Sequence, residues 1–163
     1  MKAMNLFQTI IFSFFLFLFS SCGGGEESEP EPKKTQEEIA TEKLTGESSS
    51  TTWVVTGDGS VTHKGSNVTS EYADFSLTLS AISSNRTYTT TNGGYLFDES
   101  GSWSFSGDGY GKIMLTGGSP AAGKEMSFSG AAGTLILEFN VPAPEEARVN
   151  ALAGDYRFEL KKE

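Results

Sequence analysis

Apolar and polar residues alternate through most of the chain after residue 50. In the stretch 75–79, Phe, Leu and Leu occupy every second position with Ser and Thr between them, and the stretches 53–56, 103–106, 126–129 and 156–161 repeat this pattern. A period of two with one polar face is typical of half-buried antiparallel strands and argues against helices. This alternation constrains the fold most strongly, because every such strand must bury one face.

Short clusters of Gly, Asn and Asp separate the alternating runs. Examples are "GDGS", "GSN", "NGG" and "GDGYG", which supply the positive φ angles of hairpin turns. Weaker strands at 61–64, 86–91 and 112–116 bring the total to about eight or nine. Most connections are too short for anything except antiparallel neighbours. The sequence therefore predicts an all-β, up-and-down meander.

The last strand of such a meander can pair with the first. This pairing closes the sheet into a barrel of about eight strands and removes the exposed strand edges. A longer link, "VPAPEEARVNALAG" at 141–154, precedes the last strand and is expected to contain one helical turn. A two-sheet β-sandwich with Greek-key links is the alternative architecture.

The inward faces of these strands carry bulky residues. An eight-stranded barrel is just wide enough to be filled by side chains or to hold one small ligand. We therefore expect a largely filled interior, with any pocket at one open end. The expected inward residues are Trp53, Val55, Phe75, Leu77, Leu79, Tyr88, Trp103, Phe105, Ile113, Leu115, Met126, Phe128, Leu135, Leu137, Phe139, Tyr156, Phe158 and Leu160.

One short helix is predicted ahead of the strands. Thr35 is a typical N-cap residue, and Glu38 three positions later completes a capping box at the start of "TQEEIATEKL". The helix is expected to end near Gly46.

The N-terminus has the features of a secretory signal peptide. Lys2 gives a positively charged start, residues 10–19 contain Ser13 as their only polar residue, and small residues lead to Cys22. The apolar stretch is too short to cross a bilayer as a helix. We expect residues 1–21 to be removed.

Cys22 is the only cysteine, which excludes an intramolecular disulfide. Its position after Ser20 and Ser21 resembles the lipobox of bacterial lipoproteins, in which the cysteine is lipidated and becomes the mature N-terminus. A multiply acylated cysteine would hold the protein stably on a membrane. The alternative is a free thiol beside an ordinary cleavage site.

Three regions follow from these features: a signal peptide at 1–21, an acidic tether with a short helix at 22–43, and a β-barrel domain at 44–163. The segment "GGGEESEPEPKKTQEE" has almost no apolar residues and should be a disordered tether. Its acidic start resembles the signals that carry lipoproteins of Bacteroidota to the outside of the outer membrane. A solvated spacer on a periplasm-facing protein is the alternative.

Charge narrows the choice of partners. The chain has 12 Lys and Arg against 21 Asp and Glu, a formal net charge of −9. Both the tether and the domain are acidic. This argues against binding to nucleic acid and against adhesion to an anionic lipid surface by charge alone.

A Trp-X-X-X-Gly-Asp-Gly motif occurs twice, as "WVVTGDG" at 53–59 and "WSFSGDG" at 103–109. Each copy offers one carboxylate, Asp58 or Asp108, whereas Ca²⁺ needs six to eight oxygen ligands. Paired catalytic carboxylates would have to flank a cleft. Asp-Gly is above all a hairpin signal, so we interpret both copies as turns that follow a core tryptophan.

No other residue pattern predicts catalysis. His63 is the only histidine, and no nucleophile-elbow motif is present. A zinc site would need carboxylates almost alone. We expect no enzyme activity, no catalytic residues, no metal site and no cofactor.

Aromatic residues are the better candidates for ligand contact. Trp53, Trp103 and Tyr88 could line a pocket or stack on sugar rings. Each tryptophan also shares a strand face with an apolar neighbour, Val55 or Phe105, which favours core packing as the other interpretation.

Most of the mature chain resembles the lipocalin-like lipoproteins of Bacteroidota, a mostly uncharacterised family. The resemblance lies in the lipobox, the acidic tether, "EKLTG", "GSNVTSEYADFSLTLS", "GSWSFSGDG" and "RVNALAGDYRFELKK". It implies a lipocalin-like barrel on an outer-membrane lipoprotein, exposed at the cell surface, that binds a small apolar or glycan ligand. The alternative is a structural or assembly lipoprotein whose filled barrel docks a partner protein. The sequence leaves the ligand and the oligomeric state undetermined.

Overall fold

The computed structural model describes residues 33–131, 133–143 and 151–163. The predicted signal peptide, Cys22, the first half of the tether (22–32) and residues 144–150 of the link before the last strand lie outside these residues. The segment from Lys34 to Glu163 forms one compact unit. Among the described residues, no helix is long and apolar enough to span a membrane.

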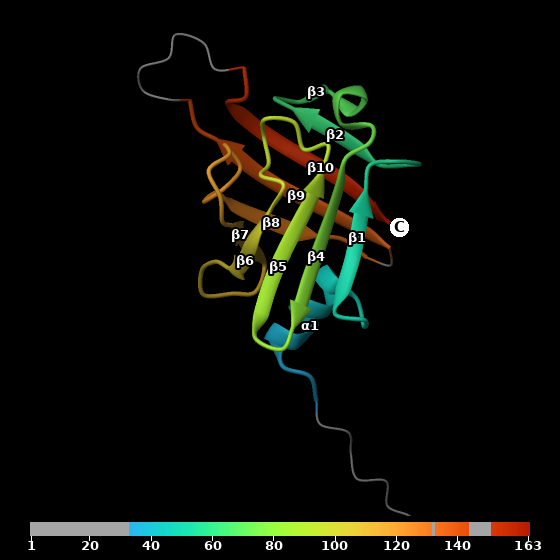
Figure 1. Ribbon diagram of the computed structural model, residues 1–163, viewed down its shortest axis with the longest axis vertical. Coiled ribbons are helices and arrows are strands. Elements are labelled where there is room, and N and C mark those ends of the chain that lie inside the picture. Colours follow the sequence, from blue (N-terminus) through green and yellow to red (C-terminus); the bar gives the residue numbers. More distant parts are fainter. Residues whose placement is uncertain (1–32, 132, 144–150) are drawn as a thin grey trace, which may run out of the picture. The chain divides into compact units, whose positions relative to one another are not determined.

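The unit is built from strands, as the alternation predicts (Figure 1). In the described part of the chain, one α-helix precedes them and one 3₁₀ helix, η1, follows the third strand. In chain order the elements are α1 (Gln36–Thr45), β1 (Ser50–Val54), β2 (Ser60–His63), β3 (Ser66–Asn67), η1 (Thr69–Tyr72), β4 (Ser76–Ile82), β5 (Asn85–Thr91), β6 (Ser100–Phe105), β7 (Lys112–Leu115), β8 (Glu125–Ser129), β9 (Thr134–Val141) and β10 (Gly154–Lys162).

The sheet closes into an antiparallel barrel of eight strands, which confirms the predicted fold class over the sandwich. Around the barrel the order is β1, β4, β5, β6, β7, β8, β9 and β10. Closure comes from the pairing of β1 with β10, in which Trp53 lies opposite Lys162 and Val54 opposite Lys161. The last strand therefore pairs with the first, as expected.

The first Gly-Asp-Gly does not form the hairpin turn that we predicted. Both β1 and β2 run antiparallel to β10, so β2 continues the course of β1 and does not turn back on it. The chain advances from Val54 to Ser60 while its partner moves only from Lys161 to Glu159. The extra residues bulge out of one interrupted strand. Gly residues with positive φ suit bulges as well as turns, and pairing with β10 decides between them.

The second Gly-Asp-Gly does form a hairpin, as predicted. It lies between β6 and β7, which pair antiparallel with Phe105 opposite Ile113. The two copies of the motif therefore have different structural roles.

Helix α1 has the predicted ends. The Thr35 side chain accepts a hydrogen bond from the Glu38 backbone N–H, and the Glu38 carboxylate accepts one from the Thr35 backbone N–H. At the other end the Gly46 backbone N–H donates to the carbonyl of Glu42. Leu44 is completely buried in the core. The helix is thus part of the compact unit, which begins at Lys34.

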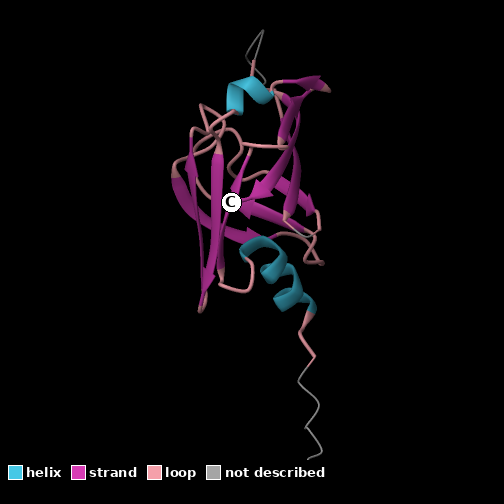
Figure 2. Ribbon diagram, turned by 90° about the vertical axis from the view of Figure 1, so that its right-hand side faces the viewer, coloured by secondary structure: helices cyan, strands magenta, loops and turns pink. Residues whose placement is uncertain are grey.

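Large side chains fill the barrel interior, as predicted. Sixteen of the eighteen expected inward residues are buried, and the other two, Phe105 and Phe128, are half-buried and pack against them. Helix α1 lies across one end of the barrel (Figure 2). At the opposite end η1 and the segment 93–97 cover the core with Tyr72, Leu96 and Phe97, all buried. The open end that we expected is therefore covered.

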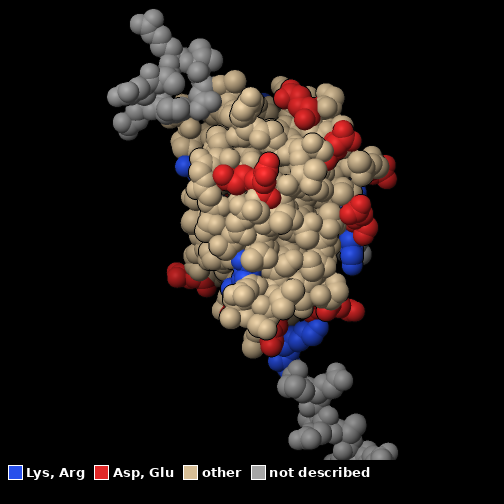
Figure 3. All heavy atoms as spheres, in the orientation of Figure 1, with Lys and Arg blue, Asp and Glu red and all other residues tan. Residues whose placement is uncertain are grey.

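The outward faces of β1, β4, β5 and β6 carry mainly Ser and Thr. Ser50 lies opposite Ser80 and Thr52 opposite Thr78, and the hydroxyls of these pairs bond at 2.7 and 3.0 Å. Charged side chains are sparse and scattered on the face shown in Figure 3. The outer wall of these strands is therefore polar but carries little charge.

Candidate functional site

The three residues predicted to contact a ligand lie in the core. Trp53 is 4 % exposed, and Trp103 and Tyr88 are each 2 % exposed. Their polar atoms bond to backbone carbonyls: Trp53 Nε1 donates to Leu44 at 2.8 Å, Trp103 Nε1 to Ser80 at 3.1 Å, and the Tyr88 hydroxyl to Thr116 at 2.6 Å. Buried indole and phenol groups with such partners stabilise the fold. Trp53 also borders a small surface hollow.

In the part of the chain that the structure describes, no three His, Cys, Asp or Glu residues gather into a group that could hold a metal ion. Asp58 lies on the bulge between β1 and β2, and Asp108 on the hairpin between β6 and β7. His63 Nε2 donates to the Ala153 carbonyl at 2.9 Å, and its ring stacks on Tyr156 with centroids 4.2 Å apart. The histidine is therefore held by the fold.

Three surface hollows border α1, between the helix and the loops at this end of the barrel. The largest, about 710 Å³, lies between α1 and the β4–β5 hairpin. The smallest, about 200 Å³, lies between the end of α1 and the β8–β9 loop. The third, about 410 Å³, lies between α1 and the β6–β7 hairpin. Volumes of about 300–1,000 Å³ are typical of small-molecule sites, so the first and third are candidates.

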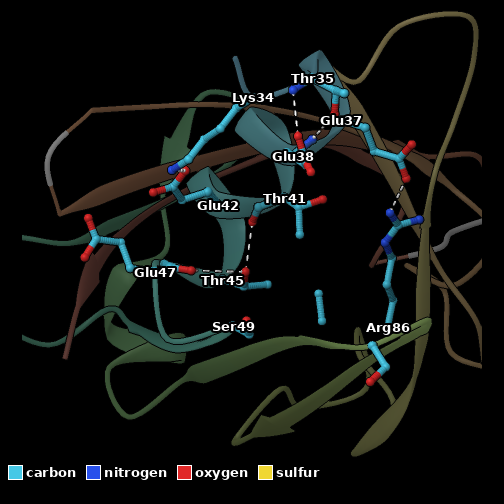
Figure 4. Close-up of a pocket in the computed structure, with 13 residues that line it drawn as sticks. Lys34, Thr35, Glu37, Glu38, Thr41, Glu42, Thr45, Glu47, Ser49 and Arg86 are labelled. Atoms are coloured by element: carbon cyan, nitrogen blue, oxygen red, sulfur yellow. Dashed lines mark hydrogen bonds and ion pairs between the residues drawn. The ribbon is translucent and has the colours of Figure 1, made fainter. Parts of the chain in front are cut away.

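The largest hollow is lined by charged residues that are mostly engaged with one another (Figure 4). Glu37 and Arg86 point toward each other and form an ion pair. The hydrogen bond from Arg86 holds the pKa of Glu37 below its usual value. The Arg86 guanidinium also lies over the rings of Trp103 and Phe105, 5.2 and 4.9 Å from their centroids. This arrangement ties α1 to β5 and β6.

The other charged residues that line this hollow mostly stabilise α1. Lys34 pairs with Glu42 at 2.6 Å, and the hydrogen bond between them raises the pKa of Lys34. Glu38 accepts the Thr35 backbone N–H at 2.7 Å, which lowers its pKa. Only Glu47, among the acids that line the hollow, makes no ion pair or side-chain hydrogen bond with another residue that the structure describes. Capping of α1 and its packing against the barrel therefore account for most of the charged residues that line this hollow.

We call the third hollow the rim groove. Its residues come from α1, from the β6–β7 hairpin and from β8: Gln36, Ile39, Ala40, Lys43, Asp108, Gly109, Tyr110, Gly111 and Phe128. Tyr110 is 41 % exposed, and its ring packs edge-on against Phe105 with centroids 5.1 Å apart. The side chains of Gln36, Lys43 and Asp108 make no hydrogen bond or ion pair with any other described residue.

The rim groove combines an exposed aromatic ring with polar groups that are available to a ligand. Sequence reasoning missed it, although "GDGYG" contains a signal: a tyrosine between glycines in a predicted turn has little chance of entering the core. Its partners on α1 are about 70 residues away in sequence, and no local pattern connects them.

The sequence analysis considered Asp108 as a metal ligand and as a catalytic carboxylate, and interpreted it as a turn residue. The structure places it in the turn and also beside Tyr110 on the groove. No family model, curated protein sequence or solved structure matches this chain. The likeness to lipocalin-like lipoproteins therefore stays a prediction from the sequence.

Proposed function

We propose that this chain is a non-enzymatic lipoprotein, anchored to a membrane through Cys22, that binds its ligand on the outside of the barrel at the end covered by α1. The observation that carries the proposal is the interior, which large side chains fill and which is covered at both ends. A lumenal site needs a cavity that the side chains leave free. A filled interior directs binding to the outer surface, where the hollows around α1 lie.

The chemistry of the described residues supports a binding role over an enzymatic one. The single histidine donates its Nε2 proton to a backbone carbonyl, and among the described residues no serine or cysteine side chain forms a hydrogen bond with its ring. The lipobox and the acidic tether support an outer-membrane location at the cell surface. A periplasm-facing orientation is the alternative, and protease treatment of intact cells distinguishes the two, because only a surface-exposed barrel is accessible.

Docking of a partner protein is the second candidate function. It is favoured by large apolar side chains that are exposed on α1 and at the end of β4, Ile39 and Ile82. Isolated exposed apolar residues are normal on soluble proteins, and these two would have to belong to a larger contiguous patch to define an interface.

Lipid attachment can be tested in a Gram-negative host that expresses the full chain in the presence of an alkyne fatty acid. We expect the wild-type chain to incorporate the label and Cys22→Ser to lose it, because Cys22 is the only thiol. An unlabelled wild-type chain would contradict the anchoring, and label on Cys22→Ser would contradict the attachment site.

Binding outside the barrel can be tested through tryptophan fluorescence. The chain has 2 tryptophans, Trp53 and Trp103, and both are in the core, so their emission reports on the interior. We expect a brominated fatty acid, which quenches indole on contact, to cause no saturable quenching of the purified protein. Because Trp53 also borders a hollow beside α1, the measurement is repeated with Trp53→Phe, in which only Trp103 reports. Saturable quenching that persists in this variant would show an apolar ligand in the lumen and would overturn the proposed location of binding.

A further inference from the structure

We propose that the rim groove binds a neutral saccharide, with Tyr110 as the surface against which a sugar ring stacks. This inference rests on the proposed function and names the ligand class of that site. The inference is carried by one juxtaposition: the exposed ring of Tyr110 lies in the same groove as Lys43 and Asp108, which have opposite charges and no side-chain partner among the described residues.

The orientation of Tyr110 is determined by a series of aromatic contacts. Its ring meets Phe105 edge-on at 5.1 Å, and Phe105 in turn meets the buried Trp103 edge-on at 5.4 Å. A ring held in this way loses little conformational entropy when a ligand binds. The face of an aromatic ring carries negative charge density, which attracts the weakly positive C–H groups on one side of a sugar ring.

The polar groups of the groove suit hydroxyl groups. Asp108 offers carboxylate acceptors, Lys43 ammonium donors and Gln36 an amide with both, and none has a side-chain partner among the described residues. A hydroxyl group can donate and accept, so it can satisfy all three. One negative and one positive side chain balance each other, which favours a neutral ligand over an anionic or a cationic one.

The glycines of the hairpin keep the groove open. A Cβ atom added to Gly109 or Gly111 would meet no atom within 4 Å apart from those of the adjacent residues in the chain, and neither glycine has a positive φ. Side chains at these positions would therefore project into space without clashing with the fold. This feature provides variants that block the groove and leave its walls intact.

The geometry favours a saccharide over a peptide. Peptides often bind by adding a strand to an open sheet edge. Here β6, β7 and β8 are each paired with a strand on both sides, so the strands next to the groove have no free edge. The groove, at about 410 Å³, has the size of a small-molecule site. A stable protein interface buries about 800 Å² on each partner, which requires a much larger surface.

The test uses isothermal titration calorimetry on the full-length lipoprotein in a detergent without a sugar headgroup. The probes are neutral oligosaccharides (maltohexaose, cellohexaose, mannohexaose and xylohexaose), with hexagalacturonate as the charged counterpart. We expect at least one neutral probe to bind and hexagalacturonate to bind more weakly. We expect Tyr110→Ala and Gly109→Leu each to weaken binding by about tenfold or more, because one removes the stacking surface and the other fills the groove.

Tyr95→Ala is the matched control. Tyr95 is 88 % exposed and lies in the segment 93–97 at the opposite end of the barrel, so its loss should leave the affinity unchanged. Gly109→Leu must keep the wild-type melting temperature, which separates blocking of the groove from unfolding.

Several results would overturn the inference. One is a failure of all neutral probes to bind at about 10 mM, a concentration that detects even millimolar affinities. Another is equal binding by wild type and Tyr110→Ala, which would place the sugar elsewhere. Binding of a protein partner that depends on Tyr110, without any sugar binding, would favour docking. The fluorescence test remains independent: quenching in the lumen rejects the proposed location of binding, whereas loss of sugar binding alone rejects only this ligand class.

Discussion

At the scale of single residues, buried polar atoms find backbone partners in almost every case. The indole N–H groups of Trp53 and Trp103 and the hydroxyl of Tyr88 each donate to a carbonyl. Thr51 Oγ1 is the exception: it is the one buried side-chain polar atom without a partner among the residues that the structure describes. An unsatisfied buried hydroxyl costs stability because it gives up its hydrogen bonds to water.

We therefore expect Thr51→Val to raise the free energy of unfolding by about 1 kcal/mol. Valine has nearly the same shape and suits a strand. Thr45→Val is the matched control, because Thr45 is equally buried but its hydroxyl donates to Thr41 at 2.9 Å. Loss of the Thr45 hydroxyl in this control should lower the free energy of unfolding by about 1 kcal/mol. Both are measured by urea denaturation, and a destabilised Thr51→Val would show that the hydroxyl has a partner such as water.

Arg86 shows how one residue can connect elements that are distant in sequence. It faces inward from β5 at the α1 end, pairs with Glu37 on the helix, and lies over Trp103 and Phe105 on β6. The sequence around Arg86 predicts that it lies in a strand. The neighbouring residues in sequence give no indication of its partners on α1 and β6. Such contacts become visible only after the barrel has brought β5, β6 and α1 together.

At the scale of elements, the interrupted β1–β2 strand is the main departure from expectation. Gly57 has a φ of 82°, which suits a turn or a bulge equally well. At Gly59 the constraint is space: an added Cβ would lie 2.8 Å from Val55 Cα and 2.9 Å from the Glu159 carbonyl oxygen. The bulge therefore packs against both its own strand and β10.

We expect Gly59→Ala to lower the free energy of unfolding by about 1–3 kcal/mol, since the methyl group forces the two strands apart. Gly111→Ala is the control, because an added Cβ there meets open space. Denaturant midpoints of both variants are compared with wild type. Equal midpoints for Gly59→Ala and wild type would mean that the bulge is looser than described.

Helix α1 illustrates what local signals achieve. Thr35 and Glu38 predict its start and Gly46 its end, and all three have these roles in the structure. The same signals contain nothing about where the helix packs. Its position across the barrel end depends on the buried Leu44 and on the bond from Trp53, both of which are tertiary contacts.

At the scale of the compact unit, titratable groups define a range of pH in which the fold is stable. Burial raises the pKa of Tyr72 from 10.0 to about 12, and it also raises the pKa values of Tyr88 and Tyr156. Hydrogen bonds lower the pKa values of several carboxyl groups, among them Asp98, which accepts the backbone N–H of Ser119. Lowered carboxyl pKa values stabilise the fold above about pH 4.5, and this contribution is lost as the pH falls further.

The raised tyrosine pKa values act at the other end of the range. The stabilisation is complete below about pH 10, where tyrosine in the unfolded chain is neutral, and is lost as the pH rises toward 12. We expect the melting temperature to decrease as the pH rises from about 10 to about 12. In Tyr72→Phe this decrease should be smaller. Tyr95→Phe, at an exposed position, should leave the profile unchanged. Identical profiles for wild type and Tyr72→Phe would exclude Tyr72 as a cause.

Sequence alone determined the strands, the helix ends and the filled core, because these depend on local periodicity and on residue type. Alternation of apolar and polar residues predicts which side chains face inward wherever the barrel closes. The pairing of β10 with β1 could also be predicted from the sequence, because a meander with short links has few other ways to remove its exposed strand edges.

Only the tertiary structure decided the roles of the two Gly-Asp-Gly copies and the composition of the rim groove. The copies share their glycines, but one lies on a strand that continues along β10 and the other joins β6 to β7. Gln36, Lys43, Asp108 and Tyr110 meet only because α1 packs beside that hairpin. The physical reason is common to both: backbone preferences are local, whereas strand partners and surface grooves depend on parts of the chain that only the folded barrel brings together.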